Sequence, residues 1–372
     1  MQATGYAVTY TAGAPVPYGL AAYSLDSGFG AGPALFGGLG GITYAQSLST
    51  PVFDPSGQFG FLLSTGAAGN SIVTYSVAAN TTPYSMAVGS NPTGRPALTP
   101  DGRFAYQLDS GGATPGTGGI LQFSVTSGQL ASIPGGPSAN LHDPRFLKVD
   151  PTGRFAYLYC GTSPPYDTTS PPAVLAYRID PATGALTYLN QVAGGAISIS
   201  AVSPAEPLLI DPSGTYVFVL NAPPNGFSAY QIGSDGHLSA APGNPFKPGL
   251  PQDIRSGIVD PSGKFLFVLA AKTDNIIAYS INLTPAAGTD ALTPIGVYAT
   301  GADTSEGAGL AIDPTGKFLY VADESKYLPS ASVSSFYVDP NSGILTATPG
   351  GPLSLRATGT TGPTLATVAV PQ

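Results

Sequence analysis

Charge, cysteine, histidine and tryptophan are all scarce in this sequence of 372 residues. Charged residues make up 9% of the chain and its formal net charge is -8, so it offers no cationic surface that would neutralise a phosphate backbone, and we expect no nucleic-acid partner. The one cysteine, Cys160, excludes an intrachain disulfide and a Cys-based zinc site, and two histidines are too few for a multi-histidine metal site. We therefore expect neither a metal ion nor a cofactor.

Long apolar runs are missing as well. No segment approaches the ~20 apolar residues that cross a bilayer, and residues 1–6 have neither a basic start nor a hydrophobic stretch, so we expect no membrane insertion. Little lysine, much Thr, Ser, Gly and Pro, and a start inside a strand-like pattern are typical of an exported bacterial protein without its signal peptide. The expected localisation is extracytoplasmic, either periplasmic or secreted, with the cytoplasm as the alternative.

Glycine and proline, in contrast, are abundant, with 49 and 38 residues. Alone, this composition would indicate disorder, but 42% hydrophobic residues and 20 tyrosines favour a packed all-β protein in which Gly and Pro form the turns.

A turn motif recurs six times, at spacings of 45, 51, 61, 49 and 53 residues. Asp or Thr at its first position can bond the backbone of the turn, Pro presets φ at the second, and Gly is favoured at the fourth. Each copy therefore predicts a type I turn between two strands. The copies are Asp54-Pro-Ser-Gly57, Thr99-Pro-Asp-Gly102, Asp150-Pro-Thr-Gly153, Asp211-Pro-Ser-Gly214, Asp260-Pro-Ser-Gly263 and Asp313-Pro-Thr-Gly316.

A second signal follows each turn. After a short strand rich in aromatic and β-branched residues, such as 264–269, an aromatic residue opens a further strand, commonly followed by a hairpin turn. Each repeat of about 52 residues therefore holds four strands, which is typical of a propeller blade. The aromatic residues are Tyr75, Phe123, Tyr177, Tyr230, Tyr279 and Phe336.

The two ends of the chain each supply part of one further repeat. The aromatic signal occurs a seventh time at Tyr23 with no turn motif before it, and residues 363–370 resemble the strand that precedes each turn elsewhere. We predict an all-β, seven-bladed β-propeller of four-stranded antiparallel blades that uses residues 1–372 as one domain. Its ring is closed by a blade shared between about 1–45 and 360–372. An open solenoid or tandem sandwiches would not explain these complementary ends.

The strand and turn pattern Asp-Pro-Ser/Thr-Gly-Lys/Arg-Phe-Leu-Tyr-Val runs through the whole chain. Without Trp, the WD and kelch signatures are excluded. Pattern and length resemble the YVTN-repeat and lactonase family of seven-bladed propellers, which includes the cytosolic type of 6-phosphogluconolactonase and carboxymuconate cyclase. The motif reports turns and core strands, and this fold hosts unrelated functions, so the resemblance bears more on the fold than on the activity.

Charged residues away from the turns concentrate in loops that enter the innermost strands, and these loops should converge on the mouth of the central channel. These residues are Arg95, His142, Asp143, Arg145, Glu206, Asp253, Arg255, Asp303 and Glu306, and Tyr166 lies on a loop at the same rim. We hypothesise a metal-independent lactonase site. His142 or Glu206 would act as general base, while Arg95, Arg145 or Arg255 would hold a substrate carboxylate or stabilise an oxyanion. Asp253, Asp303, Glu306, Tyr166 and Arg95 would bind the substrate.

The family resemblance implies a similar arrangement. Lactonases of this group have a His-containing segment just before an inner strand, with Glu and Arg before neighbouring ones. Residues 141–150, including His142, occupy the matching place here, with Glu206 one blade later and Arg255 one blade after that. The family segment has the form His-Pro-His, of which this chain keeps one histidine.

Simpler interpretations stand beside this one. His142 could bond a loop backbone, Asp143 and Arg145 could form a local ion pair, Cys160 could be a buried structural thiol, and His237 a solvent-facing turn residue. The alternative function is a non-catalytic extracytoplasmic or cell-surface scaffold, whose Pro-rich loop 161–173 would contact a protein or glycan partner instead of a small-molecule substrate. Buried ionisable groups around one pocket would favour the enzyme, and scattered solvated charges the scaffold.

Overall fold

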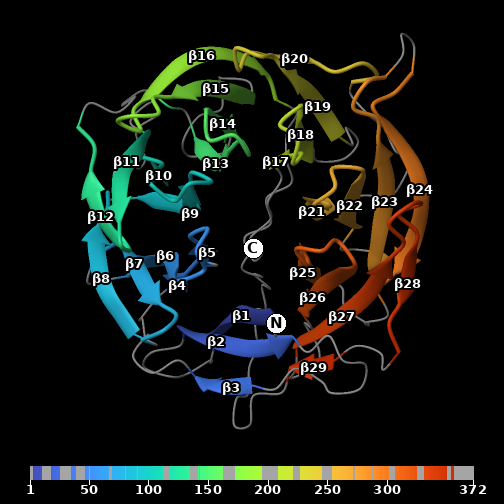
Figure 1. The fold of residues 1–372 in the computed structure, drawn as a ribbon, viewed down its shortest axis with the longest axis horizontal. Helices are drawn as coiled ribbons and strands as arrows, with labels where there is room; N and C mark the ends of the chain where they lie inside the picture. Colours follow the sequence, from blue (N-terminus) through green and yellow to red (C-terminus); the bar gives the residue numbers. More distant parts are fainter. Residues whose placement is uncertain are drawn as a thin grey trace.

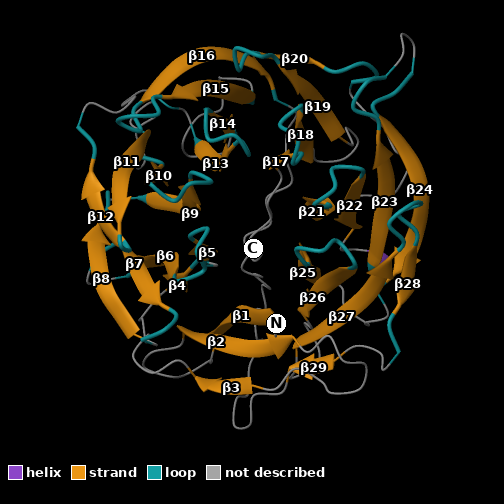
Figure 2. Ribbon diagram, viewed as in Figure 1, coloured by secondary structure: helices purple, strands orange, loops and turns teal. Residues whose placement is uncertain are grey.

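The fold consists of seven antiparallel sheets that follow one another around a central axis in chain order (Figure 1). The computed structural model describes residues 3–10, 18–25, 35–38, 47–49, 51–66, 69–79, 81–89, 91–111, 118–134, 141, 143–161, 172–194, 208–220, 227–244, 254–270, 273–285, 289–300, 306–324, 331–349 and 353–355. In these segments the secondary structure is strands and turns, without an α-helix (Figure 2). The structure therefore confirms the predicted seven-bladed β-propeller.

The sheets are numbered along the chain, innermost strand first in all but the first sheet. The first sheet contains β1 (Ala3–Tyr10), β2 (Tyr18–Leu25) and β3 (Leu35–Gly38). The second contains β4 (Ser47–Leu48), β5 (Val52–Phe53), β6 (Phe59–Thr65), β7 (Ser71–Ser76) and β8 (Thr81–Ala87). The third contains β9 (Pro92–Leu98), β10 (Phe104–Asp109), β11 (Gly119–Thr126) and β12 (Gln129–Ser132). The fourth contains β13 (Pro144–Val149), β14 (Phe155–Cys160), β15 (Ala173–Ile179) and β16 (Leu186–Ala193).

The remaining three sheets repeat this plan. The fifth contains β17 (Leu208–Ile210), β18 (Tyr216–Leu220), β19 (Phe227–Ile232) and β20 (Leu238–Ala240). The sixth contains β21 (Ile254–Val259), β22 (Phe265–Ala270), β23 (Asn275–Ile281) and β24 (Leu292–Ala299). The seventh contains β25 (Glu306–Ile312), β26 (Phe318–Glu324), β27 (Ala331–Val338), β28 (Leu345–Ala347) and β29 (Leu353–Leu355), the last of which also pairs with β27.

The first sheet has one strand fewer among the described residues. Tyr23 lies in β2, just as the repeat aromatic Tyr177 lies in β15, the third strand of its blade. Strands β1, β2 and β3 therefore correspond to the second, third and fourth strands of the other blades. No described strand of this sheet corresponds to the innermost one. The strand predicted at that position, within 360–372, lies outside the described residues, so closure of the ring by the two chain ends remains a prediction.

The repeated turn has the predicted form. In the fourth blade the amide of Gly153 donates to the carbonyl of Asp150 at 2.9 Å, and one carboxylate oxygen of Asp150 accepts from the amide of Phe155 at 2.8 Å. Gly153 has a φ of 70°, a left-handed conformation that glycine adopts without steric cost. The carboxylate thus caps the start of β14, and the turn fixes how the first two strands of each blade pair.

The core lies between neighbouring sheets. In β14, Phe155, Tyr157 and Tyr159 belong to the cluster shared with the fifth sheet, whereas Ala156, Leu158 and Cys160 belong to the cluster shared with the third. All six residues are buried. Because successive side chains of a strand point to opposite faces, a strand covered on both sides needs an unbroken apolar run.

Several blades also contact a glycine in the outer hairpin of the next blade. The hydroxyl of Tyr157 donates to the carbonyl of Gly236 in the next blade at 3.2 Å, and a Cβ on Gly236 would lie 2.3 Å from the ring of Phe155. Tyr106 and Phe104 make the same contacts with Gly184 one blade earlier. Glycine is required there because the ring of the preceding blade occupies the space of a side chain.

Candidate active site at the inner strands

The inner strands β9, β13, β21 and β25 carry bulges at the end remote from the repeated turn. In β13, Pro144 pairs with Cys160 and Phe146 with Tyr159, so Arg145 is the extra residue. In β21, Ile254 pairs with Ala270 and Ser256 with Leu269, so Arg255 is the extra residue, and in β25 the corresponding residue is Ala308. A bulge turns the backbone locally and re-aims a side chain, which makes these positions suited to a site.

The third blade has a wider bulge. Thr93 and Ala97 of β9 pair with Leu108 and Tyr106, so residues 94–96 lie opposite the single residue Gln107. Gln107 is fully buried, and the amide nitrogen of its side chain donates to the carbonyl of Thr93 at 2.8 Å. This hydrogen bond stabilises the bulge. Arg95 is the half-buried charged residue of this segment.

The bulge position is marked in the sequence by its distance from the turn. Arg145, Arg255 and Ala308 each stand five residues before the first residue of the following turn motif. Glu206 stands five residues before Asp211, and Gly94, the residue next to Arg95, stands five before Thr99. The same repeat position therefore holds a glycine, two arginines, a glutamate and an alanine in five successive blades.

The inner strands of neighbouring blades contact each other. Strand β13 packs beside β9 and β17, and β21 beside β17 and β25. A Cβ on Gly94 would lie 3.2 Å from the backbone carbonyl oxygen of Arg145, and the φ of Gly94 is 70°. Any larger residue at position 94 would press on the neighbouring bulge, so the glycine allows Arg95 and Arg145 to lie in adjoining backbone segments.

Arg145 is held by a buried carboxylate. Its Nε lies 2.5 Å from Oδ1 of Asp143, whose side chain is 1% exposed, while that of Arg145 is 21% exposed. Among the described residues neither carboxylate oxygen of Asp143 accepts a well-aligned hydrogen bond, so the guanidinium of Arg145 is its counter-charge. Burying a carboxylate is costly unless it is paired. The pair therefore fixes where the guanidinium of Arg145 can lie.

The backbone around Asp143 is shaped for this pair. Asp143 has a φ of 46°, in the left-handed region that Asp tolerates better than most residues, and its carbonyl accepts from the amide of Gly161 at 2.9 Å. A Cβ on Gly161 would lie 3.0 Å from Oδ2 of Asp143. Strain of this kind persists when surrounding contacts hold it, and it is concentrated at functional sites.

Cys160 lies close to the ion pair of Asp143 and Arg145. It is buried and free, as predicted, and burial together with the Asp143 carboxylate raises the pKa of its thiol to about 12. A thiol that stays protonated is a poor nucleophile. Cys160 therefore serves as core at the end of β14, where it pairs with Pro144.

The structure changes the placement of four predicted site residues. Arg95, Arg145, Arg255 and Glu306 were expected in loops that enter the inner strands, but they lie within β9, β13, β21 and β25 themselves. The bulges allow strand pairing to continue past them, which the sequence pattern did not reveal. Glu306 pairs with Glu324 at the open end of its blade.

The other predicted site residues lie outside the described part of the chain: His142, Glu206, Asp253, Asp303 and Tyr166. The ion pair proposed as the simpler interpretation of Asp143 and Arg145 is present. His237 is exposed in its hairpin and lies 2.9 Å from the carboxylate of Asp235, as expected for a turn residue. Within the described ranges, no three His, Cys, Asp or Glu residues are grouped as metal ligands would be, and no helix is long and apolar enough to cross a membrane.

Comparison with known proteins agrees with this architecture. A family model for lactonases with a seven-bladed β-propeller matches residues 107–293, half of the chain. The chain belongs to this lactonase family. Strands β11 to β23, with the bulges of β13 and β21, lie inside the matched region. No curated protein sequence matches the chain closely enough to count as a relative.

Solved structures of other proteins have the same fold as this lactonase-family propeller, although their sequence identity to it is low. A protein from Lactobacillus plantarum is 15% identical with a TM-score of 0.66, covering 93% of this chain and 95% of its own. A proposed 6-phosphogluconolactonase from Bacteroides uniformis is 17% identical with a TM-score of 0.63 and covers 99% of both chains. The periplasmic gluconolactonase of Pseudomonas aeruginosa is 17% identical with a TM-score of 0.62, covering 95% of this chain and 98% of its own.

Proposed function

We propose that this lactonase-family propeller hydrolyses a small acidic or sugar-derived lactone at the end of the inner strands where the bulges lie. The observation that carries the proposal is the ion pair between Arg145, at the bulge of β13, and the buried Asp143. A buried carboxylate that orients a partly exposed guanidinium at a strand bulge is costly to maintain for stability alone. A guanidinium held in a fixed position can stabilise an oxyanion as it develops, without reorganisation during the reaction.

The reaction would add one water to the ring ester. The base removes a proton from the water, the resulting hydroxide attacks the carbonyl carbon, and the bond from that carbon to the ring oxygen breaks. The ring oxygen takes up a proton and leaves as a hydroxyl group, so the product is an open-chain hydroxy carboxylate. His142 or Glu206 is the proposed base, and Arg145 or Arg255 the group that stabilises the oxyanion.

The geometry of Arg145 supports its share in this scheme. A guanidinium has five N–H donors in a rigid fork, and the contact with Asp143 is made by Nε. Asp143 would thus be a positioning residue, and Arg145 would act on the substrate through its guanidinium. Arg95 in the adjoining bulge, with Asp253, Asp303, Glu306 and Tyr166, would decide which lactone is bound.

We further propose an extracytoplasmic location. The likeness to a periplasmic gluconolactonase supports this, as do the low charge and the composition of the chain. The partner in this proposal is a small-molecule substrate, not a nucleic acid or a membrane.

The test is hydrolysis of sugar, phosphosugar and muconate lactones followed by pH-stat. The variants are His142→Ala, Glu206→Ala, Arg145→Met and Asp143→Asn, and the matched control is Lys264→Met, a turn residue of another blade at the opposite end of the inner strands. Loss of an oxyanion donor or of a general base lowers kcat by about 10² or more. We expect this for Arg145→Met and for one of the first two variants, with Lys264→Met unchanged.

Asp143→Asn distinguishes positioning from a purely structural role. If the carboxylate only orients Arg145, this variant should lower kcat more than it raises KM while remaining folded by circular dichroism. Absence of turnover by the wild-type protein across the panel would refute the lactonase proposal. The binding or cell-surface scaffold would then be the better hypothesis, to be tested with protein and glycan partners of the same face.

A further inference from the structure

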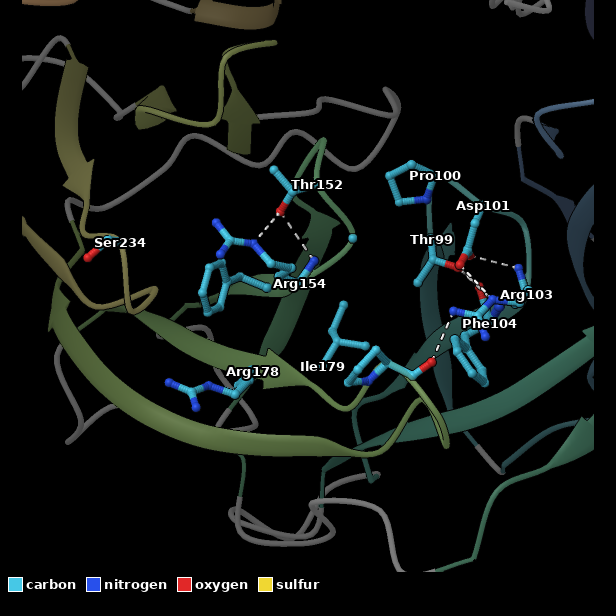
Figure 3. Close-up of a pocket in the computed structure, with 13 residues that line it drawn as sticks. Thr99, Pro100, Asp101, Arg103, Phe104, Thr152, Arg154, Arg178, Ile179 and Ser234 are labelled. Carbon is cyan, nitrogen blue, oxygen red and sulfur yellow. Dashed lines mark hydrogen bonds and ion pairs between the residues drawn. The ribbon is translucent and has the colours of Figure 1, made fainter.

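A hollow lies at the turn end of the inner strands, remote from the bulges. It is a groove of about 650 Å³ between the third and fourth blades (Figure 3). Its walls are the repeated turns of both blades and the hairpin after β15, together with Ser234 of the fifth blade. The lining residues are Thr99, Pro100, Asp101, Arg103, Phe104, Thr152, Gly153, Arg154, Phe155, Arg178, Ile179, Pro181 and Ser234.

The groove gathers positive charge in an acidic protein. It holds three of the chain's seven arginines and one carboxylate, that of Asp101, while the net charge of the chain is -8. The sequence alone does not show this convergence, because the arginines of the third and fourth blades are brought together by packing between the blades. A local excess of cations favours binding of anions, most of all at low ionic strength.

The three arginines differ in the partners that they have within the protein. Arg103 is neutralised within the protein: its Nε lies 2.6 Å from Asp101, and its Nη2 donates to the carbonyl of Pro181 at 3.0 Å. Arg154 donates from Nε to the hydroxyl of Thr152 at 3.1 Å and lies over the ring of Phe155 at 5.0 Å. Arg178 donates from Nη2 to the backbone carbonyl of Asp235 at 3.4 Å.

Nearby carboxylates do not neutralise the second and third of these arginines. No ion pair found among the described residues includes Arg154 or Arg178. Asp150 is occupied by the amides of its own turn, and Asp235 lies 2.9 Å from His237. In Figure 3, Arg154 and Arg178 lie on the same side of the groove, toward Ser234, while Arg103 lies with Asp101 on the other. Two guanidinium groups on one side therefore have no carboxylate partner among the residues that the structure describes.

Arg178 is the residue that the repeat does not explain. Arg103 and Arg154 occupy the basic position after the turn glycine, as Lys264 and Lys317 do in other blades. Arg178 follows the aromatic residue of the third strand, and the equivalent residues are Ser76, Ser124, Gln231, Ser280 and Tyr337. The fourth blade alone, among these six, places a cation there, so the groove is a local addition to the turn pattern.

We propose that this groove binds a small organic anion with two or more carboxylate or phosphate groups, held by Arg154 and Arg178. Guanidinium groups match the geometry of both acids in bidentate hydrogen bonds. The volume is in the range of small-molecule sites, and Phe104, Phe155, Ile179 and the two prolines supply apolar contact. The groove lies at the opposite end of the strands from the lactonase site and does not depend on that proposal.

Calorimetric titration at low ionic strength tests the site, with citrate and inorganic phosphate as probes. The variants are Arg178→Gln, which installs the residue found at this position in the fifth blade, and the double variant Arg154→Gln/Arg178→Gln. Lys264→Gln, at the basic turn position of the sixth blade, is the matched control. We expect citrate to bind more tightly than phosphate, with Kd rising about tenfold in Arg178→Gln and further in the double variant, as expected for a lost charge-assisted contact.

The controls separate this site from general charge effects. Lys264→Gln should bind citrate as the wild-type protein does, and Arg103→Gln should change Kd less than Arg178→Gln because Arg103 is already paired. Equal citrate affinity in wild type and Arg178→Gln would overturn the proposal. So would equal losses in Arg178→Gln and Lys264→Gln, which would indicate a diffuse effect of net charge, or absence of any citrate binding by the wild-type protein.

Discussion

Arg145→Met removes the counter-charge of a carboxylate that is almost fully buried. The side chain of Asp143 is 1% exposed and that of Arg145 is 21% exposed, so solvent screens this pair little. Removing one partner of such a pair costs about 3–5 kcal/mol, chiefly through the unpaired charge that stays behind. An unfolding entropy of about 2.1 cal/mol/K per residue gives roughly 0.8 kcal/mol/K for this chain, so Tm should fall by about 4–6 °C.

The assay is a double-mutant cycle by scanning calorimetry with wild type, Arg145→Met, Asp143→Asn and the double variant. Asparagine keeps the shape of Asp143 without its charge, so the double variant should be more stable than Arg145→Met alone. The matched control is Arg154→Met, since Arg154 has no carboxylate partner among the described residues, and it should shift Tm by about 1 °C or less. A Tm for Arg145→Met equal to that of Arg154→Met would refute the buried-pair reasoning, as would a double variant less stable than both single ones.

Two further predictions concern packing and protonation. Gly236→Ala should lower Tm by several degrees more than Gly263→Ala. Both glycines have positive φ, but a Cβ on Gly236 would lie 2.3 Å from the ring of Phe155, whereas a Cβ on Gly263 would lie 3.7 Å from the nearest side chain; equal shifts in calorimetry would contradict the proposed role of this contact between blades. Because the pKa of Cys160 is raised to about 12, its thiol should react with a disulfide reagent at pH 8 at least 10²-fold more slowly in the native protein than in urea. The contribution of this protonated thiol to the free energy of unfolding should be lost as pH rises from about 9 to about 12. Fast labelling of the native protein would contradict this.

The turns and blades could be predicted because the interactions that define them are local. The carboxylate of Asp150 bonds an amide five residues ahead, and the glycine of the same turn adopts positive φ. Every copy of the motif therefore carries its own structural information, and copies separated by about one blade length indicate the repeat. The continuous apolar run of β14 likewise follows from a strand that is covered on both faces.

The bulges could not be predicted from alternation alone. A bulge changes the register between two strands, and the periodicity of one strand does not show where its partner shifts. The pairing of Pro144 with Cys160 and of Phe146 with Tyr159 makes Arg145 the extra residue, and this depends on both strands. The constant five-residue distance from the turn would have revealed the position, because Arg145, Glu206 and Arg255 share it.

The two ends of the inner strands are under different constraints, and this explains where the chain can acquire function. At the turn end, Asp150 and Gly153 are fixed by the hydrogen bonds of the turn, so that end repeats nearly unchanged from blade to blade. At the bulge end the extra residue is not tied to a partner in the ladder, and the repeat position holds residues as different as Gly94, Arg145 and Ala308. The turn motif does not constrain the residue type there, which favours the bulge end for substrate chemistry. The Arg178 groove is a proposed ligand site at the turn end, and there the turns keep the sequence that the fold requires. Its specificity comes from one residue on the neighbouring third strand, where the other blades carry uncharged side chains.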